Sequence, residues 1–298
     1  FTMARGRNTG LDYLVDRHSY CQFVQFVDGD CEMSAGWMDV GLQFLQDHQD
    51  YGGVCGNRSE RSPNATLYNR LIAMEWQGSE GEVDACGGDA IYRIGMFQAA
   101  GCFNENMIAG EEADLCLRMR QLGYRLRRVD SPMTLHDANM QHFSQWWLRS
   151  VRCGHAYAHG YDMHRHDADA AINAGGYNRK PMLSGLLYGL VMPGLLVIIL
   201  SILVASTSGL KPLLLFATAI VVLAAYGRIG RKASESKAAQ FNSTRQRLVY
   251  AAFIVMAKLP EALGVLRYYF NRTVGKTSKI IEYKENNRAK ESARSLKD

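Results

Sequence analysis

The chain falls into two parts by its pattern of hydrophobic and polar positions. Up to about residue 165, short apolar runs alternate with segments of helical spacing, and this alternation is typical of an α/β domain. Beyond Lys180 the apolar residues gather into stretches too long for strands. We therefore predict an α/β domain in residues 1–165, a connector in 166–181 and a membrane part after it.

Apolar and polar spacing predicts the elements of the first part. Residues 21–27 are rich in Val and Phe and lack Pro and Gly, so we expect a buried strand there. Helical spacing recurs after it, and Gly123 is placed to end one of the helices. The remaining predictions are a loop or helix at 1–16, helices at 37–48, 67–76 and 111–122, a short strand or turn at 52–56, a loop able to cover a site at 57–64, and an edge strand at 124–129.

Two carboxylates follow the strand at residues 21–27. Asp28 and Asp30 are separated by Gly29, which permits the backbone to turn so that both side chains converge. Ligands of open α/β sheets gather at the carboxyl ends of strands, and carboxylates there can hold a hard divalent cation. An ordinary acidic turn has the same residue types, so the pattern alone leaves both interpretations open.

A second acidic group begins the helix predicted at 111–122. Glu111, Glu112 and Asp114 lie in its first turn, where acids complement the positive end of the helix dipole. Three acids in four positions exceed that need, and one carboxylate can act as a general base for an attacking hydroxyl.

Other segments offer binding groups. The Gly87-Gly88 pair lets another group approach the backbone closely, with Asp89 or Arg93 placed to bind a sugar or phosphate, or it is a plain turn. Arg7 and Asn8 can bond phosphate or a base edge, or begin a solvated helix. His136 closes a strand as a third metal ligand or as an ordinary histidine. Adjacent tryptophans that include Trp147, followed by Arg149, form either a sugar platform or a membrane-interface belt.

The second part of the chain is suited to a membrane. Residues 182–227 contain two apolar stretches and predict two transmembrane helices. The basic loop at 228–247 places that end in the cytoplasm, on the same side as the α/β domain. Lys258, Pro260, Glu261 and Arg267 interrupt residues 248–270, which we interpret as an interfacial helix. A third crossing is the alternative, and it would place the basic tail at 271–298 outside.

Net charge and cysteine content narrow the class of protein. The net charge of +5 is concentrated in 228–247 and in the tail, and no stripe of interleaved aromatic and basic residues indicates nucleic-acid binding. The seven cysteines are odd in number and contain no Cys-x-x-Cys pair, so neither a disulfide framework nor a zinc site is indicated.

Taken together, the motifs resemble glycosyltransferase family 2. The resemblance covers residues 1–160 and implies a Rossmann-like GT-A fold. The family normally opens with a strand and loop that hold the nucleotide base, and these would precede Phe1, so we expect the domain to be incomplete at its N-terminus. The motifs are, in order, Ala4-x-x-Arg7-Asn8-x-Gly10, Asp28-Gly29-Asp30, Gly87-Gly88 with Arg93, Gly101-x-Phe103-x-Glu105, and Gly110-Glu111-Glu112-x-Asp114-Leu115-x-x-Arg118.

The resemblance implies transfer of a sugar, with inversion, from a nucleotide-sugar donor to a lipid-linked or polysaccharide acceptor. It implies that Mg2+ or Mn2+ is bound by Asp28, Asp30 and His136 and that Glu112, or its neighbour Glu111, is the catalytic base. The remaining roles it implies are donor binding by Arg7, Asn8, Asp28, Gly87, Gly88, Asp89 and Arg93, and acceptor binding by Trp147 and Arg149.

Membrane-anchored bacterial members that build surface polysaccharide are similar to this chain in arrangement, which implies a multi-pass protein of the inner (plasma) membrane with a cytoplasmic catalytic domain. Processive members carry Gln-x-x-Arg-Trp, whereas the order here is Gln145-Trp-Trp147-Leu-Arg149, so we expect a non-processive hexosyltransferase. The expected partners are the donor, the acceptor and membrane lipids, without nucleic acid. The alternative is a catalytically idle membrane scaffold of a glycan-assembly complex.

Overall fold

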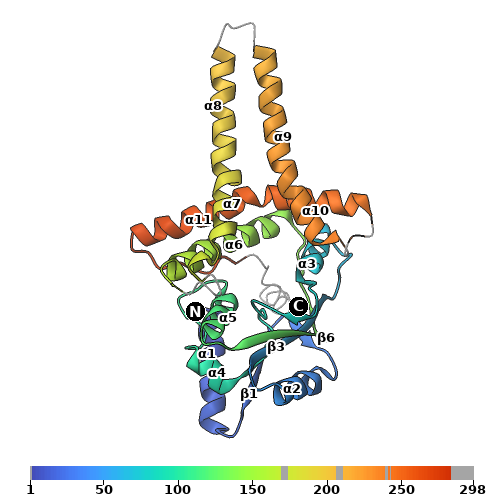
Figure 1. The fold of residues 1–298 in the computed structure, drawn as a ribbon, viewed down its shortest axis with the longest axis vertical. Coiled ribbons are helices and arrows are strands. Elements are labelled where there is room, and N and C mark those ends of the chain that lie inside the picture. The colour runs from blue at the N-terminus through green and yellow to red at the C-terminus, as the bar shows by residue number, and fades with distance from the viewer. Residues whose placement is uncertain (1, 169–173, 206–210, 239–240, 242, 283–298) are drawn as a thin grey trace, which may run out of the picture.

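A computed structural model describes residues 2–168, 174–205, 211–238, 241 and 243–282. It has a sheet domain at one end and a pair of long helices that project from the other end, with two further helices lying crosswise between these parts (Figure 1). Most of the predicted basic tail, residues 283–298, lies outside the described residues.

The domain is built on one mixed sheet, which confirms the α/β class. The strand order is β1-β5-β3-β6-β2, with β4 paired to β6, and β3 and β6 are parallel while the other pairs are antiparallel. The strands are β1 (Phe23–Phe26), β2 (Cys31–Met33), β3 (Tyr51–Glu60), β4 (Gly81–Glu82), β5 (Ala90–Arg93) and β6 (Arg125–His136).

The helices of the domain confirm the helical predictions. Gly123 has φ +83°, a left-handed conformation that ends α5 as the sequence predicts. They are α1 (Met3–Arg17), α2 (Trp37–Asp47), α3 (Leu67–Trp76), α4 (Ile94–Ala99), α5 (Glu111–Gln121) and α6 (Phe143–His164).

Three strand predictions need correction. The strand at 21–27 is not buried throughout, because β1 ends the strand order and only Phe26 of its residues is buried. The predicted edge strand at 124–129 is the first half of β6, which lies inside the sheet because β3 pairs with it on one side and β4 on the other. Residues 57–60 are not in a loop but extend β3 as far as Glu60.

The sheet packs against its helices through aromatic side chains. Phe26 of β1, Phe97 of α4 and Phe103 form a triangle of rings with centroids 5.0 to 5.4 Å apart. Trp37 of α2 is fully buried on the sheet and donates its indole N–H to Gln25 at 2.8 Å. This core holds the strand ends that carry the candidate site.

The helices after α6 form the part of the chain predicted to enter a membrane. Among the described residues, three helical segments are long and apolar enough to cross a membrane by length and composition, namely Arg179–Ala205, Lys211–Ser236 and Thr244–Thr273. The helices α8 and α9 stand side by side, and α10 and α11 cross their base (Figure 1). The elements are η1 (Ala174–Gly176), α7 (Arg179–Leu186), a π-helical turn η2 (Leu187–Val191), α8 (Met192–Ala205), α9 (Lys211–Ser236), α10 (Thr244–Met256) and α11 (Lys258–Thr273).

Glycine residues allow the backbones of α11 and α6 to come into direct contact. A Cβ atom on Gly154 would overlap the carbonyl group of Glu261, and one on Gly264 would overlap the carbonyl oxygen of Val151. The absence of side chains at these two crossing points lets the helices approach each other more closely than other residues allow. The membrane part is thus attached rigidly to the α/β domain.

We predict that Gly264→Ala destabilises the protein by ~1–3 kcal/mol, because the added methyl group must push α11 away from α6. Thermal unfolding of the detergent-solubilised protein measures this. Gly10→Ala is the matched control, since a Cβ there meets nothing within 4 Å and alanine is the better helix former. Equal melting temperatures for the two variants would contradict the close packing.

Candidate active site

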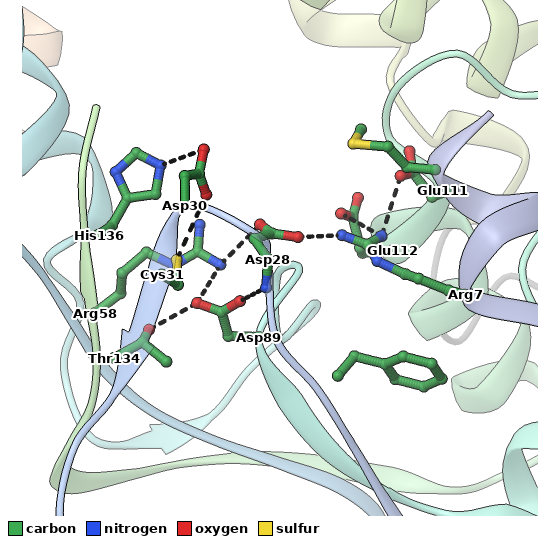
Figure 2. A network of polar contacts seen from close by, with 12 residues as sticks. Arg7, Asp28, Asp30, Cys31, Arg58, Asp89, Glu111, Glu112, Thr134 and His136 are labelled. Carbon is green, nitrogen blue, oxygen red and sulfur yellow. Dashed lines mark hydrogen bonds and ion pairs between the residues drawn. The ribbon is translucent and has the colours of Figure 1, made fainter. Parts of the chain in front are cut away.

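A cavity of about 580 Å³ opens beside the turn that joins β1 to β2. It brings together predicted residues from α1, the Asp-Gly-Asp turn, the start of α5, the end of β6 and α6. Figure 2 shows most of their side chains pointing toward one another. The lining residues are Met3, Arg7, Asp28, Gly29, Asp30, Arg58, Trp76, Glu112, His136, Arg149, Arg152, Ile280 and Glu282.

Strand pairing places Asp30 beside His136. The antiparallel register sets Cys31 opposite His136, and the N–H of Asp137 donates to the carbonyl oxygen of Asp30 at 2.9 Å. The imidazole Nε2 of His136 then lies 3.5 Å from Asp30 Oδ2 (Figure 2). Asp30 and His136 lie far apart in the sequence, and the pairing of β2 with β6 brings them together as predicted.

Arg7 connects the two acidic motifs. Its guanidinium lies 2.5 Å from Asp28, 3.1 Å from Glu111 and 3.0 Å from Glu112, and it stacks over the ring of Phe103. Burial disfavours the charged form of Arg7, but the three carboxylates outweigh it and raise the pKa of Arg7. A permanent cation therefore neutralises acids that would otherwise repel one another.

The two glutamates at the start of α5 have different environments. Glu112 lines the cavity with its side chain 19% exposed, whereas Glu111 is 1% exposed and does not line it. Among the described residues, Glu111 Oε2 has no hydrogen-bond partner. Burial, together with the charge of Glu112, raises the pKa of Glu111 to about 7. Of the two glutamates, only Glu112 is thus open to the cavity.

The third acid of this turn is structural. Asp114 is fully buried and pairs with Arg118 and His164, each at 2.7 Å. Burial opposes its ionisation, but these two partners prevail and lower the pKa of Asp114. Asp114 therefore holds α5 in place and does not line the cavity.

Arg58 is a site residue that the sequence interpretation missed. It extends from β3 to Asp89 at 2.7 Å and to Asp28 at 3.4 Å, and it lies over the ring of Trp76. The sequence interpretation assigned this segment to a loop because of its polar residues and following proline. Only the pairing of β3 with β6, which sets Arg58 opposite Thr134, directs it into the cavity.

Asp89 and the Gly87-Gly88 pair support the turn that carries Asp28. Asp89 is fully buried; it accepts the N–H of Asp28 at 2.8 Å and the hydroxyl of Thr134 at 2.6 Å. Gly87 has φ +82°, and a Cβ on Gly88 would lie 2.6 Å from Asp28 Oδ2. These residues do not line the cavity themselves. They fix the position of Asp28, which does.

Like Gly87, Gly88 and Asp89, three further predicted binding residues lie outside the cavity lining. Asn8 exchanges hydrogen bonds with the backbone of Phe103 at 2.9 and 3.1 Å. Arg93 donates to the backbone carbonyl groups of Leu45 at the end of α2, of His48 after it and of Tyr51 at the start of β3, so in this structure it braces the fold. Trp147 packs against Phe143 on α6, next to the cavity residue Arg149.

Two groups of side chains have the proximity needed for a cation. Asp30, Cys31 and His136 form one, and Asp28, Cys31 and Asp89 form the other, with ligand atoms within 4.8 Å of one another in each. The predicted ligands Asp28, Asp30 and His136 are thus divided between the two groups. Carboxylate oxygens suit Mg2+ and Mn2+, and an imidazole nitrogen is an additional ligand for a divalent ion, so the carboxylates and His136 fit such a cation, whereas the Cys31 thiol common to both groups is a softer ligand.

No family model and no curated protein matches the chain. Solved structures similar to it include the crystal structure of S. aureus TarS 1-349, with a TM-score of 0.40, 12% sequence identity, and 96% of this chain and 77% of that chain covered. TarS 1-349 in complex with UDP has a TM-score of 0.39, 12% identity and the same coverage. A longer TarS structure has a TM-score of 0.35 and 14% identity, and 40% of that chain is covered.

We predict that Glu111→Gln removes a pH-dependent cost to stability. The folded-state pKa of Glu111 is about 7 and its ordinary value is 4.5, so the folded protein binds the extra proton between these values and wild-type stability falls as pH rises through them. The variant should therefore gain ~1–3 kcal/mol relative to wild type from pH 4.5 to pH 7. Denaturant unfolding at several pH values measures this, and a constant difference across the range would contradict it.

Proposed function

We propose that this protein is a membrane-associated inverting glycosyltransferase. It moves a sugar from a nucleotide-sugar donor to a lipid-linked or polysaccharide acceptor in cell-surface glycan synthesis. The observation that supports this most is a single cavity with Glu112 on one side and Asp28, Asp30 and His136 on the other, bridged by Arg7 (Figure 2). Such transfer needs a base and a charge-stabilising group on opposite sides of the reacting carbon.

Glu112 is the proposed base. It takes the proton of the acceptor hydroxyl while that oxygen forms a bond to C1 of the donor sugar. The bond from C1 to the diphosphate oxygen breaks at the same time, and its electron pair leaves with the nucleoside diphosphate. Attack opposite the departing group inverts the anomeric carbon. Glu112 is preferred to Glu111 because only Glu112 lines the cavity.

Cationic side chains are available to stabilise the charge that develops on the diphosphate. Arg58 and Arg152 line the cavity, Arg149 is kept for the acceptor side and is paired with Glu75, and Arg7 holds Asp28 and Glu112 at their separation. The proposed Mg2+ or Mn2+, held by Asp30 and His136 with Asp28 nearby, supplies Lewis-acid stabilisation when bound. Fixed charges of this kind stabilise a leaving diphosphate without reorganising during the reaction.

The helices α8 and α9 are the proposed membrane anchor, and α10 with α11 lies on the membrane surface. One face of α11 packs on α6, and the opposite face exposes apolar side chains at positions 259, 263, 266 and 270, a helical spacing. Tyr268 lies on the face of α11 turned to the α/β domain, where it is buried and its hydroxyl donates to Asp162. The basic residues that follow the apolar part of α9 favour the cytoplasmic side.

The segment after α11 supports this arrangement over a third crossing. Ser278 lies 2.8 Å from His155 of α6, and Ile280 and Glu282 line the catalytic cavity. A membrane-crossing α10 and α11 would carry these residues away from the cavity they line. The cavity then lies next to the membrane surface, which suits a lipid-linked acceptor.

We predict that Glu112→Gln and Asp30→Ala each lower donor turnover by at least ~100-fold, since they remove the base and a diphosphate-side charge. The measurement is release of nucleoside diphosphate by the full chain in membranes, with a panel of nucleotide sugars and with Mg2+ or Mn2+. Glu32→Gln is the matched control, because Glu32 is an exposed carboxylate on β2 outside the cavity lining.

The panel also tests the scaffold alternative. Turnover that both substitutions abolish and the control retains supports the transferase. Absence of both turnover and nucleotide-sugar binding in the intact membrane protein would favour the idle scaffold.

We further predict that the C-terminus lies on the same side of the membrane as the cavity. A C-terminal epitope tag should be protected in sealed right-side-out vesicles and accessible in inverted ones, because residues 278–282 contact the α/β domain. A tag in the α8–α9 connection, at positions 206–210, is the control and should show the opposite pattern. A C-terminal tag accessible in right-side-out vesicles would establish the third crossing.

A further inference from the structure

Glu60 contacts His136 from outside the cavity. It is the last residue of β3, and the parallel register with β6 places it opposite His136. Its side chain is 0% exposed, and its Oε2 lies 3.2 Å from His136 Nδ1. Glu60 does not line the cavity, so any effect it has there passes through the imidazole.

The surroundings of Glu60 make its carboxylate an acceptor. The backbone N–H of Ala138 donates to both oxygens, at 3.1 and 3.3 Å, and the N–H of Ser62 donates at 3.3 Å. A further donor, the amide of Asn69, lies 3.5 Å away. Because a carboxylate has only acceptor oxygens, its hydrogen bond with His136 requires the facing nitrogen, Nδ1, to be the donor.

The hydrogen on Nδ1 determines whether the other ring nitrogen, Nε2, carries a hydrogen or a lone pair. In a neutral imidazole with its hydrogen on Nδ1, Nε2 carries a lone pair. Nε2 faces Asp30 Oδ2 at 3.5 Å, and Trp76 packs edge-on against the ring with centroids 4.1 Å apart. In this tautomer the Nε2 lone pair and a carboxylate oxygen of Asp30 face each other at the cavity wall. A divalent cation between them would be bound by both groups.

We propose that Glu60 is a positioning residue for His136. Its carboxylate holds the hydrogen on Nδ1 and thereby keeps the Nε2 lone pair directed at the cation position shared with Asp30. The assignment rests on the metal site of the proposed function and deepens it. Carboxylates that orient a metal-binding histidine in this way typically contribute 10- to 100-fold in metal affinity.

The test is Mn2+ binding to the full chain in detergent, without donor or acceptor, followed by the EPR signal of free Mn2+. Glu60→Gln should weaken Mn2+ binding about 10- to 100-fold, and Glu60→Asp, which keeps the carboxylate, should recover part of the loss. Glu32→Gln is the control for the change of charge and should bind as wild type does. Thermal unfolding of each metal-free variant checks that it is folded.

A double-mutant cycle separates positioning from a purely structural role. If Glu60 acts through His136, Glu60→Gln should cause no further loss of Mn2+ affinity in a His136→Gln background. A pulsed-EPR coupling between bound Mn2+ and an imidazole nitrogen should be present in wild type and absent in His136→Gln. An equal loss in both backgrounds would assign Glu60 a structural role and overturn the proposal.

Wild-type protein provides a second readout that needs no Glu60 variant. Nitrogen-15 spectra of the histidines at pH 8, with His136 assigned by its loss in His136→Gln, should report hydrogen on Nδ1 and none on Nε2. The opposite tautomer, or a wild type that binds no Mn2+, would overturn the proposal. If Mn2+ binding follows the expected pattern and no nucleotide sugar is turned over, the proposed function fails while the role of Glu60 stands.

Discussion

The ion pairs of Arg7 are the interaction on which the candidate site depends. Asp28 comes from the turn after β1, and Glu111 and Glu112 come from the start of α5, so their charges meet only in the folded chain. Acids this close repel one another unless a cation lies between them. Arg7 supplies it from α1, and the raised pKa of its guanidinium keeps that charge permanent. The cavity is therefore assembled before any ligand enters.

A second layer of polar residues surrounds this arrangement and comes from the parallel pairing of β3 with β6. That pairing contains shifts of register, and it sets Arg58 opposite Thr134 and Glu60 opposite His136. Through Asp89 the layer also reaches the backbone of Asp28. Side chains that approach substrate are thus held by buried partners, which is how catalytic groups keep their geometry.

The membrane part is linked to the site by close packing. Gly154 and Gly264 bring α6 and α11 to backbone contact, and the chain then returns from α11 to the cavity wall at Ile280. Under the proposed membrane arrangement, the depth of the cavity beneath the bilayer is set by rigid helices. An acceptor that remains in the membrane would meet Glu112, the proposed base, at a defined distance from the surface.

Local chemistry in the sequence was sufficient to predict the α/β class, the main helices, the acidic turn at Asp28 and the acidic start of α5, because spacing, capping and turn residues act over a few positions. The resemblance to a known family added Glu112 and His136 as candidate site residues. The roles of Arg58 and Glu60 depended on the tertiary structure, since partners across a parallel strand pair are decided by register and bulges that no local pattern encodes. For the same reason Arg93 resembled a ligand-binding residue in sequence, yet its backbone acceptors lie on α2, after it and at the start of β3.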